Sequence, residues 1–207
     1  DCHEMIQDSK GRILLLTNET KNNLIVYNKS GSLMDSWGTQ FPGAHGLTVQ
    51  QNGKEDFLFI TDTDKHQVYK TTIDGKILLT IDAPADLPAY QKKEAFVPTE
   101  TAVLANGEFY IADGYGAQHI LHYDEKGKLK NAFGGRGTGD EYLDNAHGIC
   151  VDTRNATPTL IITDRTRNAF KRFSMDGKLL EVIHLPGACM CRPVIKGDYL
   201  YAAVLRS

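Results

Sequence analysis

Four copies of one pattern follow each other along the chain, and this internal repeat limits the fold more than any other feature. Each copy has a short strand of alternating polarity, an apolar strand that ends near an aspartate, a third strand, a glycine turn and a fourth strand. The turn glycines at equivalent positions are Gly31, Gly75, Gly127 and Gly177, which gives a period of about 44 to 52 residues. A fifth copy opens near Arg192 and ends after two strands.

A repeat of this length, filled with four short strands, is typical of a propeller blade. Period-2 runs such as FLFIT and EFYIAD recur, and no window has the apolar spacing of a helix. The insertion Asp82–Phe96 is the only helical candidate, and its prolines favour a loop with one helical turn. Because propellers close into rings, we predict an all-β β-propeller of four-stranded blades, with about four and a half blades here and about six when complete.

We expect a single β-propeller domain over residues 1–207. The 41% hydrophobic content is enough for a proper core. The approximate blade boundaries are 3–42, 43–95, 96–144, 145–187 and, for the partial blade, 188–207.

Charge and hydropathy restrict the partners. The formal net charge is −3, and lysines and arginines are scattered, so no basic patch is available for a phosphate backbone and we expect no nucleic acid partner. No apolar run approaches the roughly 20 residues of a membrane-spanning helix, so we expect no transmembrane segment. We expect a monomer that takes a small molecule or a peptide in its central channel.

The four cysteines form neither a zinc knuckle nor a dense disulfide framework. They are Cys2, Cys150, Cys189 and Cys191. Cys189 and Cys191 could offer a pair of soft metal ligands, but two partly buried free thiols are the commoner outcome. Because this pattern does not decide the compartment, an extracytoplasmic location, periplasmic or secreted, is a separate expectation.

Histidine recurs at one phase of the repeat, that is, at the same position in several copies. The residues that open successive first strands are His3, His45, Thr99, His147 and Arg192. Equivalent positions converge round the channel of a propeller, and neutral imidazoles that meet there suit a zinc-like cation with an open coordination position. The alternative is that each histidine caps its own strand. The remaining histidines lie in other phases, and we expect them at the surface: His66, His119, His122 and His184.

Aspartate recurs at a second phase, where Asp62, Asp113 and Asp164 end the second strands. We expect these side chains to anchor turns by hydrogen bonds to the backbone. The positions that follow carry Asp64, Tyr115, Arg165 and Arg167. Tyr115 and Arg165 have no repeated structural role, so they are the candidates for chemistry.

The glycine-rich stretch Phe133–Leu143 (FGGRGTGDEYL) has two interpretations. A phosphate-binding loop would need a following Lys-Ser/Thr and a strand-to-helix setting, and both are missing. We therefore interpret it as a connection between blades.

Three stretches of the chain resemble one enzyme family. They are AHGLTVQQNGKEDFLFITDTDKHQVYK, FVPTETAVLANGEFYIADGYGAQHI and NAHGICVDTRNATPTLIITDRTRNAFKRF. The blades look like NHL repeats, and these stretches are similar to the peptidyl-α-hydroxyglycine α-amidating lyases over about half of the chain. The resemblance implies a six-bladed propeller with a zinc ion (Zn2+) held by three histidines and a structural calcium ion (Ca2+) in the channel.

The resemblance also implies roles for individual residues. His45 and His147 fall on two zinc-ligand positions, Tyr115 on the base, Arg165 on an active-site arginine and the carbonyl of Leu47 on a calcium-binding position. The implied reaction is lysis of a carbinolamide: zinc binds the hydroxyl oxygen, a tyrosinate removes its proton, and the C–N bond breaks to release an amide and glyoxylate. Arg165 or the metal would have to lower the tyrosine pKa from about 10.

The chain departs from the family at the third zinc ligand, which belongs to the family's last blade. The fifth repeat here opens with Cys191-Arg192-Pro193 instead. His3 has no counterpart in the family, and its repeat phase alone makes it a candidate ligand.

Three functions remain open at this point. The first is a metal-dependent lyase of the amidating-lyase type. The second is a non-enzymatic NHL-repeat propeller that binds a protein or glycan partner, since a fold does not fix a function. The third is a metal-dependent propeller hydrolase such as a lactonase, whose sites usually use carboxylate ligands.

Overall fold

The computed structural model describes residues 1–53 and 55–205. The first sheet contains β1 (Cys2–Gln7), β2 (Ile13–Thr17), β3 (Leu24–Tyr27) and β4 (Leu33–Trp37). The second contains β5 (Ala44–Asn52), β6 (Glu55–Asp62), β7 (Gln67–Thr72) and β8 (Ile77–Ile81). The third contains β9 (Glu100–Val103), β10 (Phe109–Ala112), β11 (His119–Tyr123) and β12 (Leu129–Gly134). The fourth contains β13 (Ala146–Asp152), β14 (Thr159–Asp164), β15 (Ala169–Ser174) and β16 (Leu179–His184), and a two-stranded sheet contains β17 (Met190–Lys196) and β18 (Tyr199–Val204).

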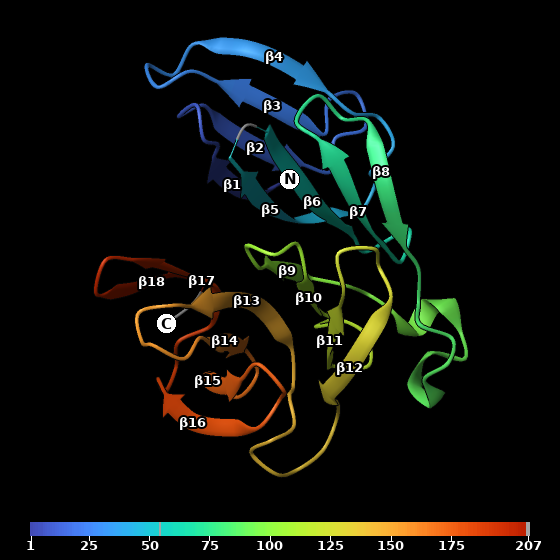
Figure 1. The fold of residues 1–207 in the computed structure, drawn as a ribbon, viewed down its shortest axis with the longest axis vertical. Helices are drawn as coiled ribbons and strands as arrows, with labels where there is room; N and C mark the ends of the chain where they lie inside the picture. Colours follow the sequence, from blue (N-terminus) through green and yellow to red (C-terminus); the bar gives the residue numbers. More distant parts are fainter. Residues whose placement is uncertain (54, 206–207) are drawn as a thin grey trace.

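Each four-stranded sheet is an antiparallel meander in sequence order. The first strands contact one another from sheet to sheet, β1 with β5, β5 with β9, β9 with β13 and β13 with β17. The fourth strands β4, β8, β12 and β16 lie at the periphery (Figure 1). First strands inside and fourth strands outside are the arrangement of propeller blades, so the predicted all-β propeller is confirmed. The predicted blade boundaries stay a prediction.

The core lies between consecutive blades. Strand β10 is buried along its whole length and so is β14, whereas β4 is almost entirely exposed. A continuous apolar run fits a second strand, because neighbouring blades cover both of its faces. Between the first two blades, for example, Leu14 and Leu24 pack with Leu47 and Ile60.

The predicted turn glycines have the backbone conformation that glycine favours. Gly31, Gly75, Gly127 and Gly177 all have positive φ, between 83° and 94°. Because a side chain is strained in this region, glycine marks the turn between the third and fourth strand of every complete blade.

The turn aspartates act as expected. Oδ1 of Asp62 accepts hydrogen bonds from the backbone N–H groups of Gly43, Asp64 and Lys65 at 2.8 to 3.1 Å. Oδ1 of Asp164 accepts one from the N–H of Asp144 at 2.9 Å. These bonds tie the end of a second strand to the segment that enters the same blade, so the predicted anchoring role is confirmed.

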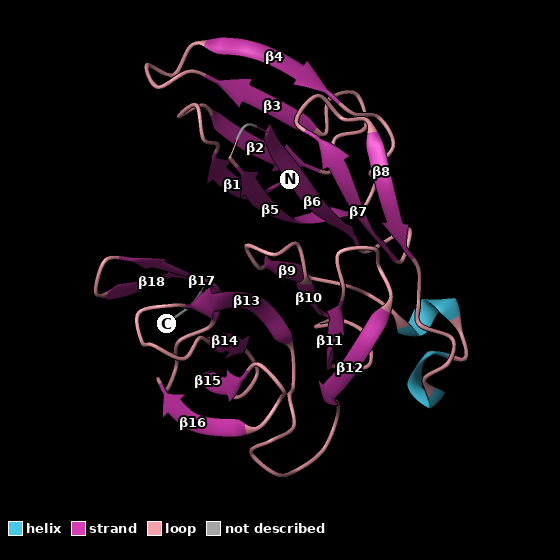
Figure 2. Cartoon of the chain, viewed as in Figure 1, coloured by secondary structure: helices cyan, strands magenta, loops and turns pink. Residues whose placement is uncertain are grey.

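Two connections lie wholly or mostly outside the sheets. The insertion Asp82–Phe96 contains two 3-10 helices, η1 (Pro88–Tyr90) and η2 (Lys93–Ala95), where the sequence predicts one helical turn (Figure 2). The stretch Phe133–Leu143 leads from β12 to β13, so its interpretation as a blade connection is confirmed. Arg167 donates a hydrogen bond to the carbonyl of Gly139 in this connection at 2.9 Å, which gives Arg167 a structural role.

The histidines outside the channel phase differ from the expectation in three of four cases. His184 is exposed, but His66, His119 and His122 are half-buried. Nδ1 of His66 bonds to the carbonyl of Phe96 at 2.8 Å. Nε2 of His122 lies 2.8 Å from Oε2 of Glu108, and its ring stacks on Tyr110. The expected surface location is wrong for these three, because contacts with polar groups and rings, either within a blade or with the next one, remove part of each imidazole from water.

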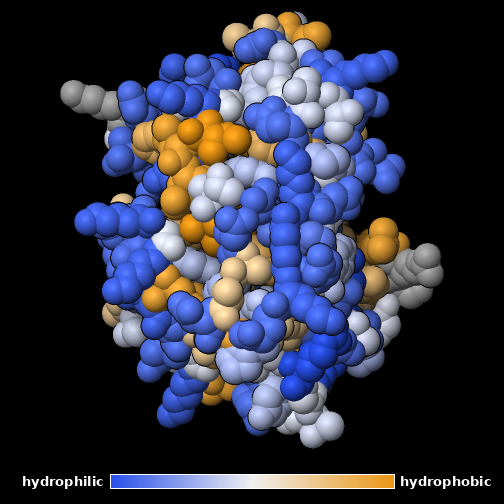
Figure 3. Space-filling view, turned by 90° about the vertical axis from the view of Figure 1, so that its right-hand side faces the viewer, coloured by the Kyte–Doolittle hydropathy of each residue, from blue (hydrophilic) through white to orange (hydrophobic). Residues whose placement is uncertain are grey.

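One outer face of the propeller is largely polar. The side that carries β8 and the two 3-10 helices is mostly hydrophilic, with apolar patches between the polar groups (Figure 3). Within residues 1–53 and 55–205, no helix is long and apolar enough to cross a bilayer.

Candidate active site

The histidines of the repeat lie where the inner strands lose their regular register. The pairing shifts between Cys2 and Glu4 in β1, between Ala44 and Leu47 in β5, between Ala146 and Gly148 in β13 and between Met190 and Pro193 in β17. The residues inside these irregularities include His3, His45, His147, Cys191 and Arg192. A β-bulge leaves a residue unpaired and re-aims its side chain, so one backbone irregularity explains why equivalent residues of several blades meet.

The neighbours of the two Ala-His-Gly histidines allow close packing. Ala44 and Ala146 are buried. A Cβ on Gly46 would lie 2.5 Å from the carbonyl oxygen of Thr99, and a Cβ on Gly148 would lie 2.5 Å from Cα of Arg192. Glycine therefore lets the next inner strand approach the bulge.

Gly114, which precedes Tyr115, makes a similar approach to the fourth blade. A Cβ there would lie 2.1 Å from the carbonyl oxygen of Ala146. We expect Gly114→Ala to lower the free energy of unfolding by about 2 kcal/mol, because the backbone of β13 must move to admit the methyl group. Urea denaturation measures this loss.

The matched control is Gly31→Ala, since nothing lies within 4 Å of a Cβ at that position and only its φ of 83° opposes the change. We expect that control to cost about 1 kcal/mol. Equal losses in the two variants would contradict the close-approach argument.

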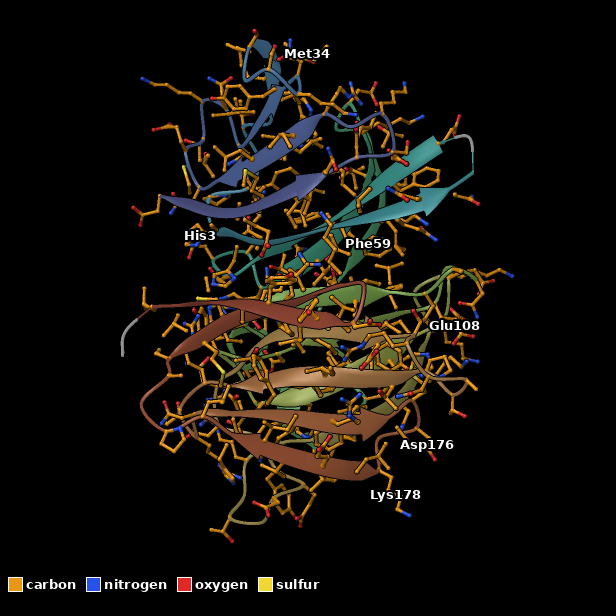
Figure 4. The ribbon with its side chains drawn as sticks, turned by 90° about the vertical axis from the view of Figure 1, so that its left-hand side faces the viewer. His3, Met34, Phe59, Glu108, Asp176 and Lys178 are labelled. Atoms are coloured by element: carbon orange, nitrogen blue, oxygen red, sulfur yellow. The ribbon has the colours of Figure 1, made fainter. Side chains whose placement is uncertain are left out.

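Three rings form the centre of the site. The ring centroids of His45 and His147 are 5.0 Å apart, and that of Tyr115 is 5.1 Å from His45 and 5.6 Å from His147. His3 lies 5.0 Å from His45. Figure 4 shows His3 at one end of the strands, opposite the turns that carry Glu108 and Asp176. The structure thus brings His45, His147 and Tyr115 together and adds His3 beside His45.

Hydrogen bonds fix the tautomer of His45. Its Nδ1 lies 2.9 Å from the carbonyl oxygen of Thr99, which can only accept, so Nδ1 carries the proton. Nε2 then accepts the hydrogen bond from the hydroxyl of Tyr115 at 3.1 Å. Burial lowers the pKa of His45, which keeps the ring neutral. A backbone carbonyl behind a neutral imidazole is the usual support of a metal-binding histidine.

His147 is also neutral. Burial, with the charge of Arg165 as the next cause, lowers its pKa to about 2. Its Nδ1 is buried and has no hydrogen-bond partner among the described residues. Since buried nitrogen atoms normally have a partner, this atom is available as a ligand for a cation. Across residues 1–53 and 55–205, however, no group of three or more His, Cys, Asp and Glu side chains could hold a metal ion. Among the described residues the site therefore offers His45 and His147, with His3 beside His45, but these side chains do not form a complete zinc ligand set.

Arg165 is held at the site by the partial blade. Its Nε donates to the carbonyl of Met190 at 3.0 Å, and its Nη2 donates to Sγ of Cys191 at 3.3 Å. Burial raises the pKa of Tyr115, and the charge of Arg165 offsets only part of that rise. Arg165 alone therefore does not lower the pKa of the tyrosine below its ordinary value.

These side chains line one cavity of about 1080 Å³, which is large enough for a small ligand or the end of a peptide. Its wall also contains Asp64, Cys191, Arg192, Glu4 and Glu100. All four cysteines are free thiols, and Cys189 and Cys191 are half-buried, as expected.

Comparison with known proteins identifies the fold family. The sequence model of the family described as "6-bladed beta-propeller" (DUF5128) matches residues 98–206, just over half of the chain. The chain belongs to this family of 6-bladed β-propellers. Over 115 residues the propeller is 40% identical to peptidyl-alpha-hydroxyglycine alpha-amidating lyase 1 of Drosophila melanogaster. The matched stretch covers 51% of this chain and 20% of that protein. The resemblance seen in the sequence is confirmed, and the chain spans about a fifth of that relative's length.

Two solved structures share the fold at low identity. Virginiamycin B lyase from Staphylococcus aureus aligns with a TM-score of 0.68 at 16% identity, over 97% of this chain and 62% of that one. A gluconolactonase from Xanthomonas campestris aligns with a TM-score of 0.70 at 16% identity, over 98% and 69%. These likenesses support the propeller architecture alone.

Met190, Glu4 and Glu100 at this propeller's site escaped the sequence analysis, and so did the contact between Cys191 and Arg165. Cys191 and Met190 hold Arg165, and Glu4 and Glu100 line the cavity. The sequence held a signal for the glutamates, because each directly follows the residue that opens the first strand of its repeat, His3 or Thr99. The thiol contact had no such signal, since it depends on how two blades pack.

Proposed function

We propose that this propeller is a zinc-dependent lyase that resembles the amidating lyases and cleaves the C–N bond of a carbinolamide. The observation that carries the proposal is the distance of 3.1 Å between the Tyr115 hydroxyl and Nε2 of His45, inside a cavity that His147 and Arg165 share. A metal on Nε2 would replace this hydrogen bond and leave the Tyr115 hydroxyl beside the metal. The same residues lie in the stretches similar to the amidating lyases. The proposed substrate is an N-acyl α-hydroxyglycine, free or at the end of a peptide.

His45 and His147 would hold the zinc ion, with His3 as a further candidate ligand. When bound, zinc acts as a Lewis acid that polarises the hydroxyl oxygen of the substrate. The neutral state of both rings and the unpartnered Nδ1 of His147 support this assignment.

Tyr115 would act as the base in its ionised form. Arg165 alone does not offset the burial that raises the pKa of this tyrosine, so the bound metal would have to supply the further positive charge that favours tyrosinate. The tyrosinate takes the proton of the substrate hydroxyl, the C–O bond becomes a carbonyl, and the electrons of the C–N bond move to nitrogen. Tyr115 then returns the proton to that nitrogen, so an amide and glyoxylate leave with no net change of protons. Met190 and Cys191 use two of the five N–H donors of Arg165, and the remaining donors can bind the substrate carboxylate.

Metal removal tests the proposal. We expect glyoxylate release from an N-acyl α-hydroxyglycine to fall about 100-fold or more after zinc is removed from the full-length protein, because the lost charge stabilisation is several kcal/mol. Zinc should restore turnover, and calcium added as the control should not. Full turnover by metal-free protein, or no glyoxylate from protein with stoichiometric zinc, would count against the lyase.

A binding propeller for a protein or glycan partner is the second candidate. The observation that favours it is the incomplete set of metal ligands among the described residues. It predicts no glyoxylate release with or without zinc.

A further inference from the structure

Arg192 places a positive charge where three other blades meet. It belongs to β17, and its Nη1 donates a hydrogen bond of 2.6 Å to the carbonyl oxygen of Leu47 in β5. The same nitrogen lies 3.4 Å from Oε1 of Glu4 in β1 and 3.6 Å from Oε2 of Glu100, which opens β9. Three oxygen atoms from three blades therefore surround one cationic nitrogen.

The cluster around Arg192 is continuous: Glu100 is buried, and Arg192 and Glu4 are half-buried. Nη2 of Arg192 donates to Oγ1 of Thr48 at 3.2 Å, and that oxygen is 3.1 Å from Oε1 of Glu100. The carboxylate of Glu100 also accepts the N–H of Thr101 at 2.9 Å and is almost fully buried. Glu4 reaches the same guanidinium from the first blade, with its Oε1 3.4 Å from Nη1 of Arg192. Without a permanent cation, these two acidic groups would lie side by side in the channel with nothing to balance them.

The residues around Leu47 do not fit the calcium ion that the family resemblance implies. Calcium takes 6 to 8 oxygen ligands at about 2.3–2.6 Å. The carbonyl of Leu47 is already bound to a guanidinium, which always carries its charge. A second cation against Nη1 would be repelled, and the repulsion is strong where water is excluded.

We propose that the guanidinium of Arg192 is the resident cation of the channel: it replaces a structural calcium ion and joins the partial blade to the first three blades. The proposal does not depend on the lyase reaction, because it concerns the stability of the ring and its response to calcium.

The test compares thermal unfolding and calcium binding of the full chain with those of Arg192→Met. We expect the Tm of the unaltered protein to be the same in calcium-free buffer and in millimolar calcium, with no stoichiometric calcium bound. In calcium-free buffer Arg192→Met should unfold about 6 °C lower or more, because the buried Glu100 and the half-buried Glu4 lose their partner. Calcium should raise the Tm of this variant, since the three oxygens become free to bind it.

The control is Arg172→Met, which removes an arginine of similar exposure that pairs with Asp152 at 2.7 Å within the fourth blade. It should lower the Tm without a calcium response. Stoichiometric calcium in the unaltered protein would overturn the proposal, and this measurement holds even if Arg192→Met fails to fold. A folded Arg192→Met that is as stable as the unaltered protein, or that takes no calcium, would overturn it as well.

Discussion

Turnover of an N-acyl α-hydroxyglycine is expected to fall about 10²–10⁴-fold in Tyr115→Phe, the usual contribution of a positioned base. The hydroxyl of Tyr115 is the only part removed, and it is the group that bonds to Nε2 of His45. The phenylalanine ring can keep the packing against His45 and His147. The loss should therefore appear in kcat, measured as glyoxylate release, rather than in folding or zinc content.

Tyr142→Phe is the matched control, because Tyr142 is an exposed tyrosine in the connection between the third and fourth blades. It should keep full turnover. Zinc content separates a lost base from a lost metal: Tyr115→Phe should bind as much zinc as the unaltered protein. If Tyr115→Phe with bound zinc turned over at the unaltered rate, Tyr115 would not be the base.

The fold was predictable because its signals are local and repeated. Turn glycines such as Gly31 and Gly177 need only the backbone of one hairpin, and Asp62 and Asp164 bond to nearby backbone N–H groups. A repeat of such signals fixes the number of strands in a blade. The half-buried His66 was not predictable, because its bond to Phe96 crosses from one blade to the next.

The site was predictable in part. Repeat phase indicates His45 and His147, and the structure adds the shared β-bulge that turns both rings into the channel. The bulge itself has no sequence signal that period-2 alternation can detect. The family resemblance likewise cannot distinguish one cation from another: it implies a calcium ion at the carbonyl of Leu47, whereas the residue that reaches this carbonyl is Arg192, 145 positions away.

The position of Tyr115 depends on the buried carboxylate of Asp113, which leads to the second large prediction. Asp113 accepts hydrogen bonds from the N–H groups of Val97 and Ala117 at 2.6 Å each and from the hydroxyl of Tyr90 at 2.8 Å. We expect Asp113→Ala to lower the free energy of unfolding by about 3–5 kcal/mol, because one buried donor and two partly buried donors lose their acceptor at once. Urea denaturation measures the loss.

Asp124→Ala provides the control within the same blade. Asp124 also accepts two backbone N–H groups, of Lys126 and Lys128 at 3.0 and 2.8 Å, but in an exposed turn where water can take over both bonds. That variant should lose only about 1 kcal/mol. Asp113→Ala should also reduce turnover in protein that is still folded, because the backbone N–H of Tyr115 bonds to the carbonyl of Val97, whose own N–H bonds to Asp113. A similar loss of stability in both variants would mean that burial of Asp113 does not set the strength of this anchor.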